Sequence, residues 1–343
     1  MNLKHYFLRR LLLIVPTLFG ISVVCFGIMQ VVPGGPVEQA VMRLKGGSGG
    51  SEGVAAGSAR AQMTQEEIER IKAYYGFDQP ITVRYWRWLK KVVHLDFGES
   101  YFYEEPVWNV IVSKFPVSLT FGLTSFFLSY LICIPLGIKK ALKHGSTFDV
   151  VSSSLVFAGY SIPSFALGIL LIVLFGGGQF LNWFPIAGMV ADNHESLTMM
   201  GKLLDYGRHM FLPLLCYVIG SFAFLTLLMK NSLLEQLSKD YMRTALAKGV
   251  PFNEAVRKHA LRNALVPIAT GFGSVLTLMF AGSILIETVF NIDGMGLLSY
   301  NSIINRDYNV AMGLIIFEAV LALLGNILSD FCYTLIDPRI NFK

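Results

Sequence analysis

The sequence predicts an all-α integral membrane protein with six transmembrane helices. Of the 343 residues, 54% are hydrophobic and only 15% are charged, whereas soluble domains carry about a quarter charged residues. The mean hydropathy is +0.55. The apolar residues also gather in long runs separated by short polar segments, which is typical of a helical bundle in lipid.

Six apolar runs are long enough to cross a hydrocarbon core of about 30 Å, which takes roughly 20 helical residues. A backbone in lipid must satisfy its own hydrogen bonds, so we expect these runs to be helices. The first run is too long for a typical signal-peptide core, so we expect it to be retained. The predicted spans are residues 11–32, 116–138, 150–175, 211–230, 266–290 and 309–330.

The basic residues of the short loops predict that both termini of this multi-pass membrane protein face the cytoplasm. The N-terminal tail holds three, segment 139–149 three, segment 230–265 seven and the C-terminal tail two. The alternate loops, 176–210 and 291–308, hold two and one. Segment 33–115 holds ten, but loops longer than about 60 residues cross largely regardless of charge.

We therefore expect three parts in the chain. They are a cytoplasmic tail with the first helix (1–32), a periplasmic segment (33–115), and a helical core (116–343) that contains a large cytoplasmic loop (231–265). Within the periplasmic segment, residues 46–58 form a Gly/Ser-rich linker that cannot bury enough apolar surface to become ordered.

Two helices are expected after this linker. Segment 64–76 has a capping-box pattern at its start and a glycine at its end. Segment 81–93 has apolar and basic residues on different sides, which predicts an amphipathic helix. That helix would either lie at the outer membrane surface, with Trp86 and Trp88 near headgroup depth, or pack against the protein's own outer face.

The sequence contains no catalytic or metal-binding pattern. The Gly201-Lys202 pair lacks the upstream glycine of a phosphate-binding loop. If ATP drives this protein, the ATPase must be another chain. Four cysteines without a CxxC pair or a suitably spaced histidine are expected to be buried side chains. They are Cys25, Cys133, Cys216 and Cys332.

The largest cytoplasmic loop predicts a helix–break–helix elbow. A helix should run from Asp240 to Lys248, stop at Gly249-Val250-Pro251 and restart at Asn253, which would cap the second helix with Glu254 in its first turn. Small residues on one side would let another backbone approach, so we expect a docking surface for a partner protein. The alternative is a loop that is merely basic. The small residues are Thr244, Ala245 and Ala247.

This elbow resembles the coupling loop of ABC importer permeases, in the variant of the oligopeptide and dipeptide branch. Arg243 and Thr244 stand where other branches have Glu-Ala, whereas Ala245 and Gly249 keep the motif's Ala and Gly. The resemblance assigns coupling to an ATPase to one set of residues. The set is Asp240, Tyr241, Arg243, Thr244, Ala245, Lys248, Gly249 and Pro251.

The resemblance extends over almost the whole chain, in the order and spacing of the B-type permeases of peptide ABC importers. It implies the type I ABC importer permease fold. The segments that carry it are RRLLLIVPTLFGISVVCF (9–26), LDFGES (95–100), SIPSFALG (161–168), FPIAG (184–188), ETVFNIDGMGLL (287–298), RDY (306–308) and DPRI (337–340).

Two features depart from the usual pattern of this family, and they make the chain resemble its Yej branch most. The Yej branch imports peptides and the peptide-nucleotide antibiotic microcin C. Pro33-Gly34-Gly35-Pro36 replaces the usual Pro-Gly-Asp-Pro, and the Gly/Ser-rich insert lengthens the periplasmic segment. A third departure is Asp293, which stands where the family often has proline.

The resemblance implies a division of labour. This chain would be a permease subunit that is not an enzyme by itself and holds no cofactor. A second, homologous permease would complete the pathway, and an ATPase with two nucleotide-binding domains would bind ATP and magnesium and grip the elbow. A periplasmic binding protein would deliver the peptide, and no nucleic acid would be bound. Closure of the two nucleotide-binding domains would then move the elbow and change the side of the membrane to which the cavity opens.

Six residues are candidates for the translocation pathway. Pro163 should kink the third span, and beside it Tyr160, Ser161 and Ser164 would face an aqueous cavity unless the kink serves packing alone. Glu318 is placed near mid-membrane, where it must face the bundle interior, a partner or water. Glu287 is expected nearer the outer interface, in a family-like run that favours a gating role.

The fifth span carries small residues, which predict close helix–helix contacts that we expect to be with the second permease. They are Gly271, Gly273, Gly282 and Ser283. Two other functions compete with the permease interpretation. A secondary transporter would use Glu318 and Glu287 as proton sites and would often show an inverted repeat, which is not evident here. An intramembrane enzyme would need a nucleophile–base or metal cluster, and the sequence shows none.

Overall fold

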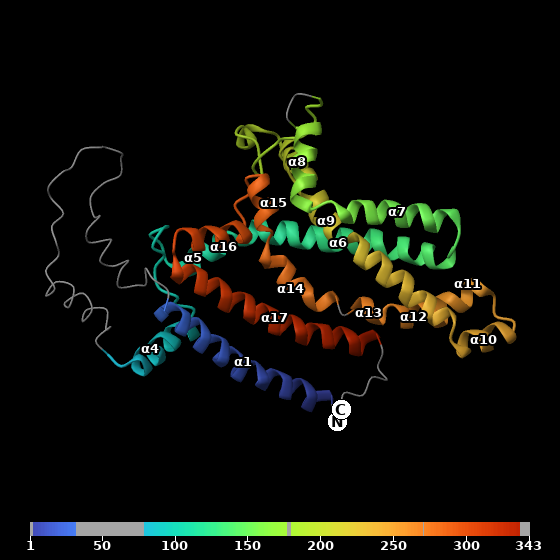
Figure 1. Ribbon diagram of the computed structural model, residues 1–343, viewed down its shortest axis with the longest axis horizontal. Coiled ribbons are helices and arrows are strands. Elements are labelled where there is room, and N and C mark those ends of the chain that lie inside the picture. The colour runs from blue at the N-terminus through green and yellow to red at the C-terminus, as the bar shows by residue number, and fades with distance from the viewer. Residues whose placement is uncertain (1–2, 32–78, 177–179, 270, 337–343) are drawn as a thin grey trace. The chain divides into compact units, whose positions relative to one another are not determined.

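The computed structural model describes residues 3–31, 79–176, 180–269 and 271–336, and most of these residues are in helices (Figure 1). No β-strand is present among these residues, apart from one isolated bridge. The predicted all-α class is therefore confirmed. The Gly/Ser-rich linker, the short helix expected after it and the terminal DPRI motif lie outside the described residues.

The chain divides into two compact units. Unit 1 comprises residues 1–14, 113–300 and 318–343, and unit 2 comprises residues 15–112 and 301–317. Two of the long helices contribute one end to each unit. They are α1 (Leu3–Val31) and α17 (Tyr308–Ile336).

At the centre of unit 1, α6 (Phe115–Leu142) packs along α9 (Met199–Leu237). Gly137 permits the close approach, because a Cβ atom there would lie 2.7 Å from the Cβ of Met229. The remaining helices of this part are α7 (Thr147–Ser161), α8 (Ser164–Phe175), α10 (Asp240–Ala247), α11 (Phe252–Ala255), α12 (Leu261–Ala264), α13 (Val266–Ala269), α14 (Gly271–Ala281), α15 (Ile284–Val289) and α16 (Met295–Ile304).

Four helices among the described residues are long and apolar enough to cross a membrane, and the bent pair α7–α8 makes a fifth if it is one span. The four are α1, α6, α9 and α17. The fifth predicted span, 266–290, is not one helix: it is divided into α13, α14 and α15. Gly282 separates the last two with a φ of +63°, a conformation that a helix cannot contain. The number six remains a prediction.

The third predicted span, 150–175, is broken at Pro163. Helices α7 and α8 meet there at 94°. Ile162 is extended, with a ψ of 121°, because a residue before proline is disfavoured in the helical region. Pro163 then provides the N-cap of α8. The expected kink is therefore a complete break of the helix.

In unit 2, α4 (Ile81–Val93) confirms the predicted amphipathic helix. It packs on α1 and on the first turns of α17, around a small apolar core that includes Cys25, Met29, Trp88 and Met312. The following loop leads to α5 (Val107–Ser113).

Asp307 holds this loop against the start of α17. Its buried carboxylate accepts hydrogen bonds from the Ser100 hydroxyl and from the Phe102 N–H, at 3.0 Å for the latter. It also accepts the Val310 N–H at 3.4 Å, as an N-cap. The LDFGES and RDY motifs, 206 residues apart in sequence at Ser100 and Arg306, therefore form one structural element.

We expect Asp307→Ala to release the loop between α4 and α5. The Ser100 hydroxyl and the Phe102 N–H would lose their acceptor, and each such buried loss costs about 1–3 kcal/mol. Hydrogen exchange of the amides around Phe102 should rise strongly. Asp96→Ala is the matched control, because Asp96 is half exposed and accepts one backbone N–H, from Gly98. Equal exchange in both variants would contradict the prediction.

Candidate functional site

The predicted elbow is present at the end of α9, where α10 and α11 form a short hairpin (Figure 1). The first helix and the break at Gly249 match the prediction. The expected cap at Asn253 is wrong: α11 begins at Phe252, and Pro251 is its N-cap. The ring of Pro251 fixes φ at −57°, which already suits a helix entry. Glu254 is in the first turn, as expected.

The inner face of the elbow is buried against its own bundle. Met242 is 2% exposed, and Ala255 and Ala260 are fully buried in the same cluster as Leu233 of α9. The Ser232 hydroxyl of α9 donates to the carbonyl of Ala264 at 2.8 Å. These contacts make the elbow a rigid continuation of α9.

Tyr241 and Ala245 belong to this inner face. The Tyr241 hydroxyl donates to Oε1 of Gln236 at 2.8 Å and accepts from the Asn263 amide at 3.3 Å. Ala245 packs on the buried cluster, and its carbonyl accepts the Val250 N–H at 3.2 Å. Ala245 was expected on the small-residue side that faces a partner, and it faces the chain's own core instead.

The outer face is exposed, and it contains the other six predicted coupling residues. They are Asp240, Arg243, Thr244, Lys248, Gly249 and Pro251. Gly249 has a φ of +82°, and a Cβ atom there would meet nothing within 4 Å. Two apolar side chains, Leu246 at 41% exposure and Phe252 at 48%, flank this turn. Sequence reasoning missed both, although their position on either side of the break was a usable signal.

The Glu254–Lys258 pair stabilises the start of α11. The ammonium donates to the carboxylate at 2.6 Å, and this hydrogen bond lowers the pKa of Glu254. The carboxylate therefore stays ionised at neutral pH, where the N-terminal end of a helix favours an anion.

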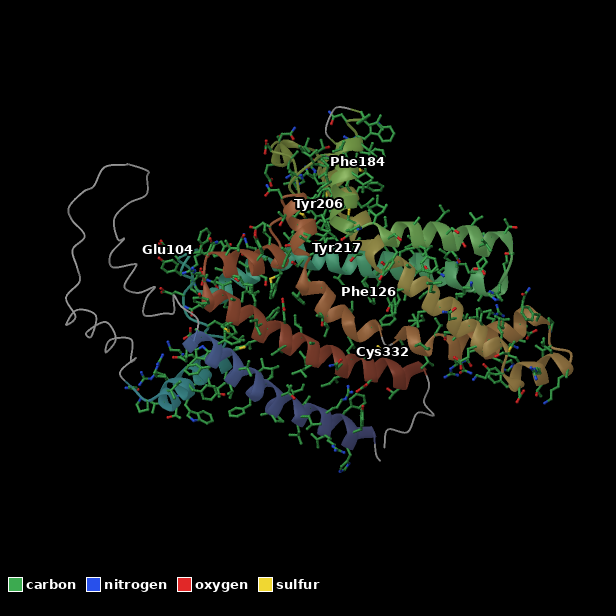
Figure 2. The ribbon with its side chains drawn as sticks, viewed as in Figure 1. Glu104, Phe126, Phe184, Tyr206, Tyr217 and Cys332 are labelled. Carbon is green, nitrogen blue, oxygen red and sulfur yellow. The ribbon has the colours of Figure 1, made fainter. Side chains whose placement is uncertain are left out.

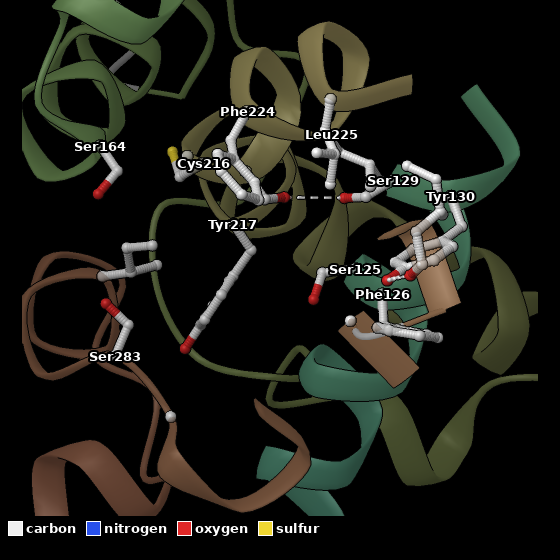
Figure 3. A pocket seen from close by; sticks show the side chains of 17 residues that line it. Ser125, Phe126, Ser129, Tyr130, Ser164, Cys216, Tyr217, Phe224, Leu225 and Ser283 are labelled. Carbon is white, nitrogen blue, oxygen red and sulfur yellow. Dashed lines mark hydrogen bonds between the residues drawn. The ribbon is translucent and has the colours of Figure 1, made fainter. Parts of the chain in front are cut away.

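A cavity of about 320 Å³ lies in unit 1 between α6, α8, α9 and the segments from α13 to α15 (Figure 3). Figure 2 shows Phe126 and Tyr217 in this region. Its walls are mostly apolar and aromatic, with five serine hydroxyls and no charged side chain. The hydroxyls of Ser129 and Ser221 lie 3.1 Å apart. The serines are Ser125, Ser129, Ser164, Ser221 and Ser283.

Of the six predicted pathway residues, only Ser164 lines this cavity. Tyr160 is 60% exposed, and the Ser161 hydroxyl donates to the Phe157 carbonyl at 2.8 Å. Glu318 is half-buried and makes no hydrogen bond within the described structure. The cavity serines on α6 and α9 were missed, because a lone serine in an apolar run gives no sequence signal.

Glu287 is not at an interface, as the sequence led us to expect, but is 1% exposed. Its carboxylate accepts the Ser283 N–H at 2.9 Å, the Leu297 N–H at 2.6 Å and the Tyr217 hydroxyl at 3.3 Å. It thereby joins the starts of α15 and α16 to the cavity wall.

The small residues of the fifth span make contacts within this chain. A Cβ atom on Gly271 would collide with the Tyr130 hydroxyl of α6, and one on Gly282 would collide with the Glu287 carboxylate. The surroundings of Gly273 are outside what the structure describes. Asp293, which replaces the family's usual proline, forms an ion pair with Lys114.

A buried charge cluster joins α6, α7 and α9, and sequence reasoning missed it. Lys140 is fully buried and donates to the Ser152 hydroxyl at 2.8 Å and the Ser153 hydroxyl at 2.7 Å. Its ammonium lies 3.3 Å from the Asp149 carboxylate, and the Lys230 ammonium donates to each of the two carboxylate oxygens at 2.8 Å. From the sequence, Lys140 was expected only to be one of the loop cations that set the orientation of the protein in the membrane.

Comparison with known proteins assigns the family. Residues 133–342 match the family described as binding-protein-dependent transport system inner membrane component, and residues 51–122 match its N-terminal model. The chain is 43% identical to an inner membrane ABC transporter permease protein, YejB, of Escherichia coli O157:H7, over 98% of this chain and 99% of that protein.

Two further relatives align over 98% of this chain. A peptidoglycan transport system permease protein, YejB, of Agrobacterium fabrum is 42% identical with 98% of its length covered, and an oligopeptide transport system permease protein, AppB, of Bacillus subtilis is 33% identical with 99% covered. The resemblance to the Yej branch is thus confirmed. The long apolar helices agree with a multi-pass protein of the inner membrane. The chain belongs to the family of binding-protein-dependent inner membrane components, the permeases of ABC transporters.

Proposed function

We propose that this chain is a permease subunit of an ATP-driven peptide importer. It works with a second, homologous permease, an ATPase with two nucleotide-binding domains and a periplasmic peptide-binding protein. ATP and magnesium are bound by the ATPase, and this chain hydrolyses nothing by itself. The relatives named for oligopeptide and peptidoglycan transport support peptides as the substrate class. Microcin C-like substrates remain a prediction from the Yej resemblance.

The observation that carries this proposal is the two-faced elbow. Its inner face is buried against α9, whereas Arg243, Gly249 and Phe252 are exposed to a partner. Helix α9 runs without interruption from the cavity residue Tyr217 to Leu237, about 30 Å at 1.5 Å per residue. A displacement of the elbow is therefore transmitted to the cavity wall through a single rigid helix.

The cavity suits a peptide of variable sequence. Serine hydroxyls both donate and accept hydrogen bonds, so they match backbone amides of any peptide. Since no charged side chain lines the cavity, the walls do not select for substrate charge. Selection would then belong mainly to the binding protein.

Contacts between the chain ends support termini on one side of the membrane. Near the N-terminus, Arg10 forms an ion pair with Asp330, close to the C-terminus, and the Tyr6 hydroxyl donates to the same carboxylate at 3.0 Å. We assign this side to the cytoplasm from the positive loops.

Uptake of a labelled oligopeptide into proteoliposomes tests the function. The four-component system should accumulate peptide with ATP, and this chain alone should accumulate none. Uphill uptake by this chain alone, driven by a proton gradient, would overturn the proposal in favour of a secondary transporter. Glu318 would then be the first proton site to test.

Gly249 provides a sharper test of the elbow. Since its φ is positive and its surroundings are open, we expect Gly249→Val to strain the turn by about 1–2 kcal/mol. Gly249→Asn, which tolerates this conformation, should strain it little. Peptide-stimulated ATP hydrolysis in the assembled transporter should fall in the valine variant and be retained in the asparagine variant. Equal loss in both would show that a partner backbone packs directly on Gly249.

A further inference from the structure

Helix α4 is fixed to α1 along one face. The hydroxyls of Tyr85 and Ser22 lie 2.8 Å apart, and the Arg84 guanidinium donates to Oε1 of Gln30 at 2.7 Å. The ring of Tyr85 packs edge-on against Phe26, with 5.4 Å between centroids. These contacts place α4 beside the C-terminal half of α1, in unit 2.

A second face of α4 is apolar and exposed. Trp86 is 59% exposed and Val93 72% exposed, and their spacing with the partly buried Leu89 places all three on one stripe of the helix. The Trp86 ring lies 6.2 Å from the Phe19 ring of α1, which is itself 45% exposed. The stripe therefore continues onto the apolar surface of a candidate membrane span.

A third face of α4 is basic. Arg87, Lys90 and Lys91 are exposed, and the helix contains no acidic residue. Arg87 donates to the neutral side-chain oxygen of Gln79 at 2.8 Å. Within the described residues, the acidic partner of this face is Asp96, 3.8 Å from Lys91, with both side chains more than half exposed. Such an exposed pair neutralises little of the charge.

We propose that α4 lies in the headgroup layer of the bilayer and binds the phosphates of anionic phospholipids through Arg87, Lys90 and Lys91. Trp86, Leu89 and Val93 reach into the acyl boundary beside Phe19. Lipid is the occupant that satisfies both exposed faces at once, since one face needs hydrocarbon and its neighbour needs anions. The helix thereby anchors the loop held by Asp307. This inference does not depend on the transported substrate.

Depth-dependent quenching tests the position of the apolar stripe. The purified protein is placed in phosphatidylethanolamine–phosphatidylglycerol vesicles that contain lipids brominated near the glycerol or near the methyl end of the chain. The fluorescence of Trp86 is the difference between the emission of the wild type and that of Trp86→Phe. This fluorescence should be quenched most by bromine near the glycerol end. Trp88→Phe is the matched control, because Trp88 packs into the core of unit 2 and should be quenched less.

Two quenching results would overturn the placement. One is quenching of Trp86 by aqueous iodide with no effect of brominated lipid. The other is strongest quenching by bromine near the methyl ends, which would put the helix deep in the hydrocarbon.

Native mass spectrometry of protein released from the same membranes tests the basic face. Wild-type protein should retain phosphatidylglycerol over phosphatidylethanolamine, and the triple variant R87Q/K90Q/K91Q should lose at least about fivefold of this preference, since one cation near an anionic surface contributes about 1 kcal/mol. Arg208→Gln removes an exposed cation on α9 and should change nothing. No preference in wild type, or the same preference in the triple variant, would overturn headgroup binding. Since all three side chains are exposed, the unfolding temperature should stay unchanged.

Discussion

Replacing Asp149 with alanine is expected to destabilise unit 1 by about 3–5 kcal/mol, the cost of leaving a buried charge without its partner. The carboxylate lies between Lys140, whose side chain is fully buried, and Lys230, whose side chain is 12% exposed. It also accepts the Gly145 N–H at 3.2 Å, while the Ser146 hydroxyl accepts the Asp149 N–H at 3.4 Å. This reciprocal cap begins α7, so the variant loses a helix start as well as a charge partner.

Thermal unfolding followed with a thiol-reactive dye would measure this loss, because Cys133 and Cys216 are fully buried until the bundle opens. Asp149→Asn retains an acceptor but not the charge, and should lie between wild type and alanine. Glu195→Gln is the matched control: its carboxylate is 92% exposed and pairs with Lys202 at 2.8 Å, so no measurable change is expected.

A double variant separates this charge effect from packing. In D149A/K140M the fully buried ammonium is gone, so the double variant should unfold at a higher temperature than Asp149→Ala alone. If the single and double variants unfold together, or if Asp149→Ala unfolds like Glu195→Gln, the cluster does not stabilise the bundle as described.

This cluster shows why the sequence predicted the helices better than the contacts between them. Apolar runs and loop charges act locally, so α1, α6, α9 and α17 could be predicted to within a few turns. Lys140 was counted as a loop cation, but it is buried where the last turn of α6 meets the first turns of α7 and Lys230 of α9. Which cations leave the solvent depends on tertiary packing, and no local pattern reports it.

The same distinction applies to the candidate site. The elbow was predictable because Gly249 and Pro251 break a helix by their own backbone chemistry. Its cap was misassigned to Asn253, since the competing start signal of Pro251 acts two residues earlier. The cavity depends on residues from six helices, and each of these residues is unremarkable in its own run.

Replacing Glu287 with alanine is expected to destabilise the α15–α16 junction by about 3 kcal/mol or more. Three donors would lose their acceptor: the Ser283 N–H, the Leu297 N–H and the Tyr217 hydroxyl. Each unsatisfied buried donor costs about 1–3 kcal/mol. The amide in Glu287→Gln keeps one acceptor oxygen but points its own N–H at another donor. This variant should therefore lose about half as much stability as Glu287→Ala. Tyr217→Phe removes a single long hydrogen bond and should be nearly neutral.

The glycines around this carboxylate offer an independent test of the same junction. A Cβ atom on Gly294 would lie 2.8 Å from both carboxylate oxygens of Glu287, so Gly294→Ala should destabilise the protein without removing any hydrogen-bonding group. Gly207→Ala on α9 is its matched control: a Cβ atom there meets nothing within 4 Å, and alanine favours a helix by up to about 1 kcal/mol. Thermal unfolding of the five variants should rank Gly207→Ala highest and Glu287→Ala lowest. A Glu287→Ala protein as stable as wild type would refute the junction and would return Glu287 to the candidates for a gating or proton-carrying residue.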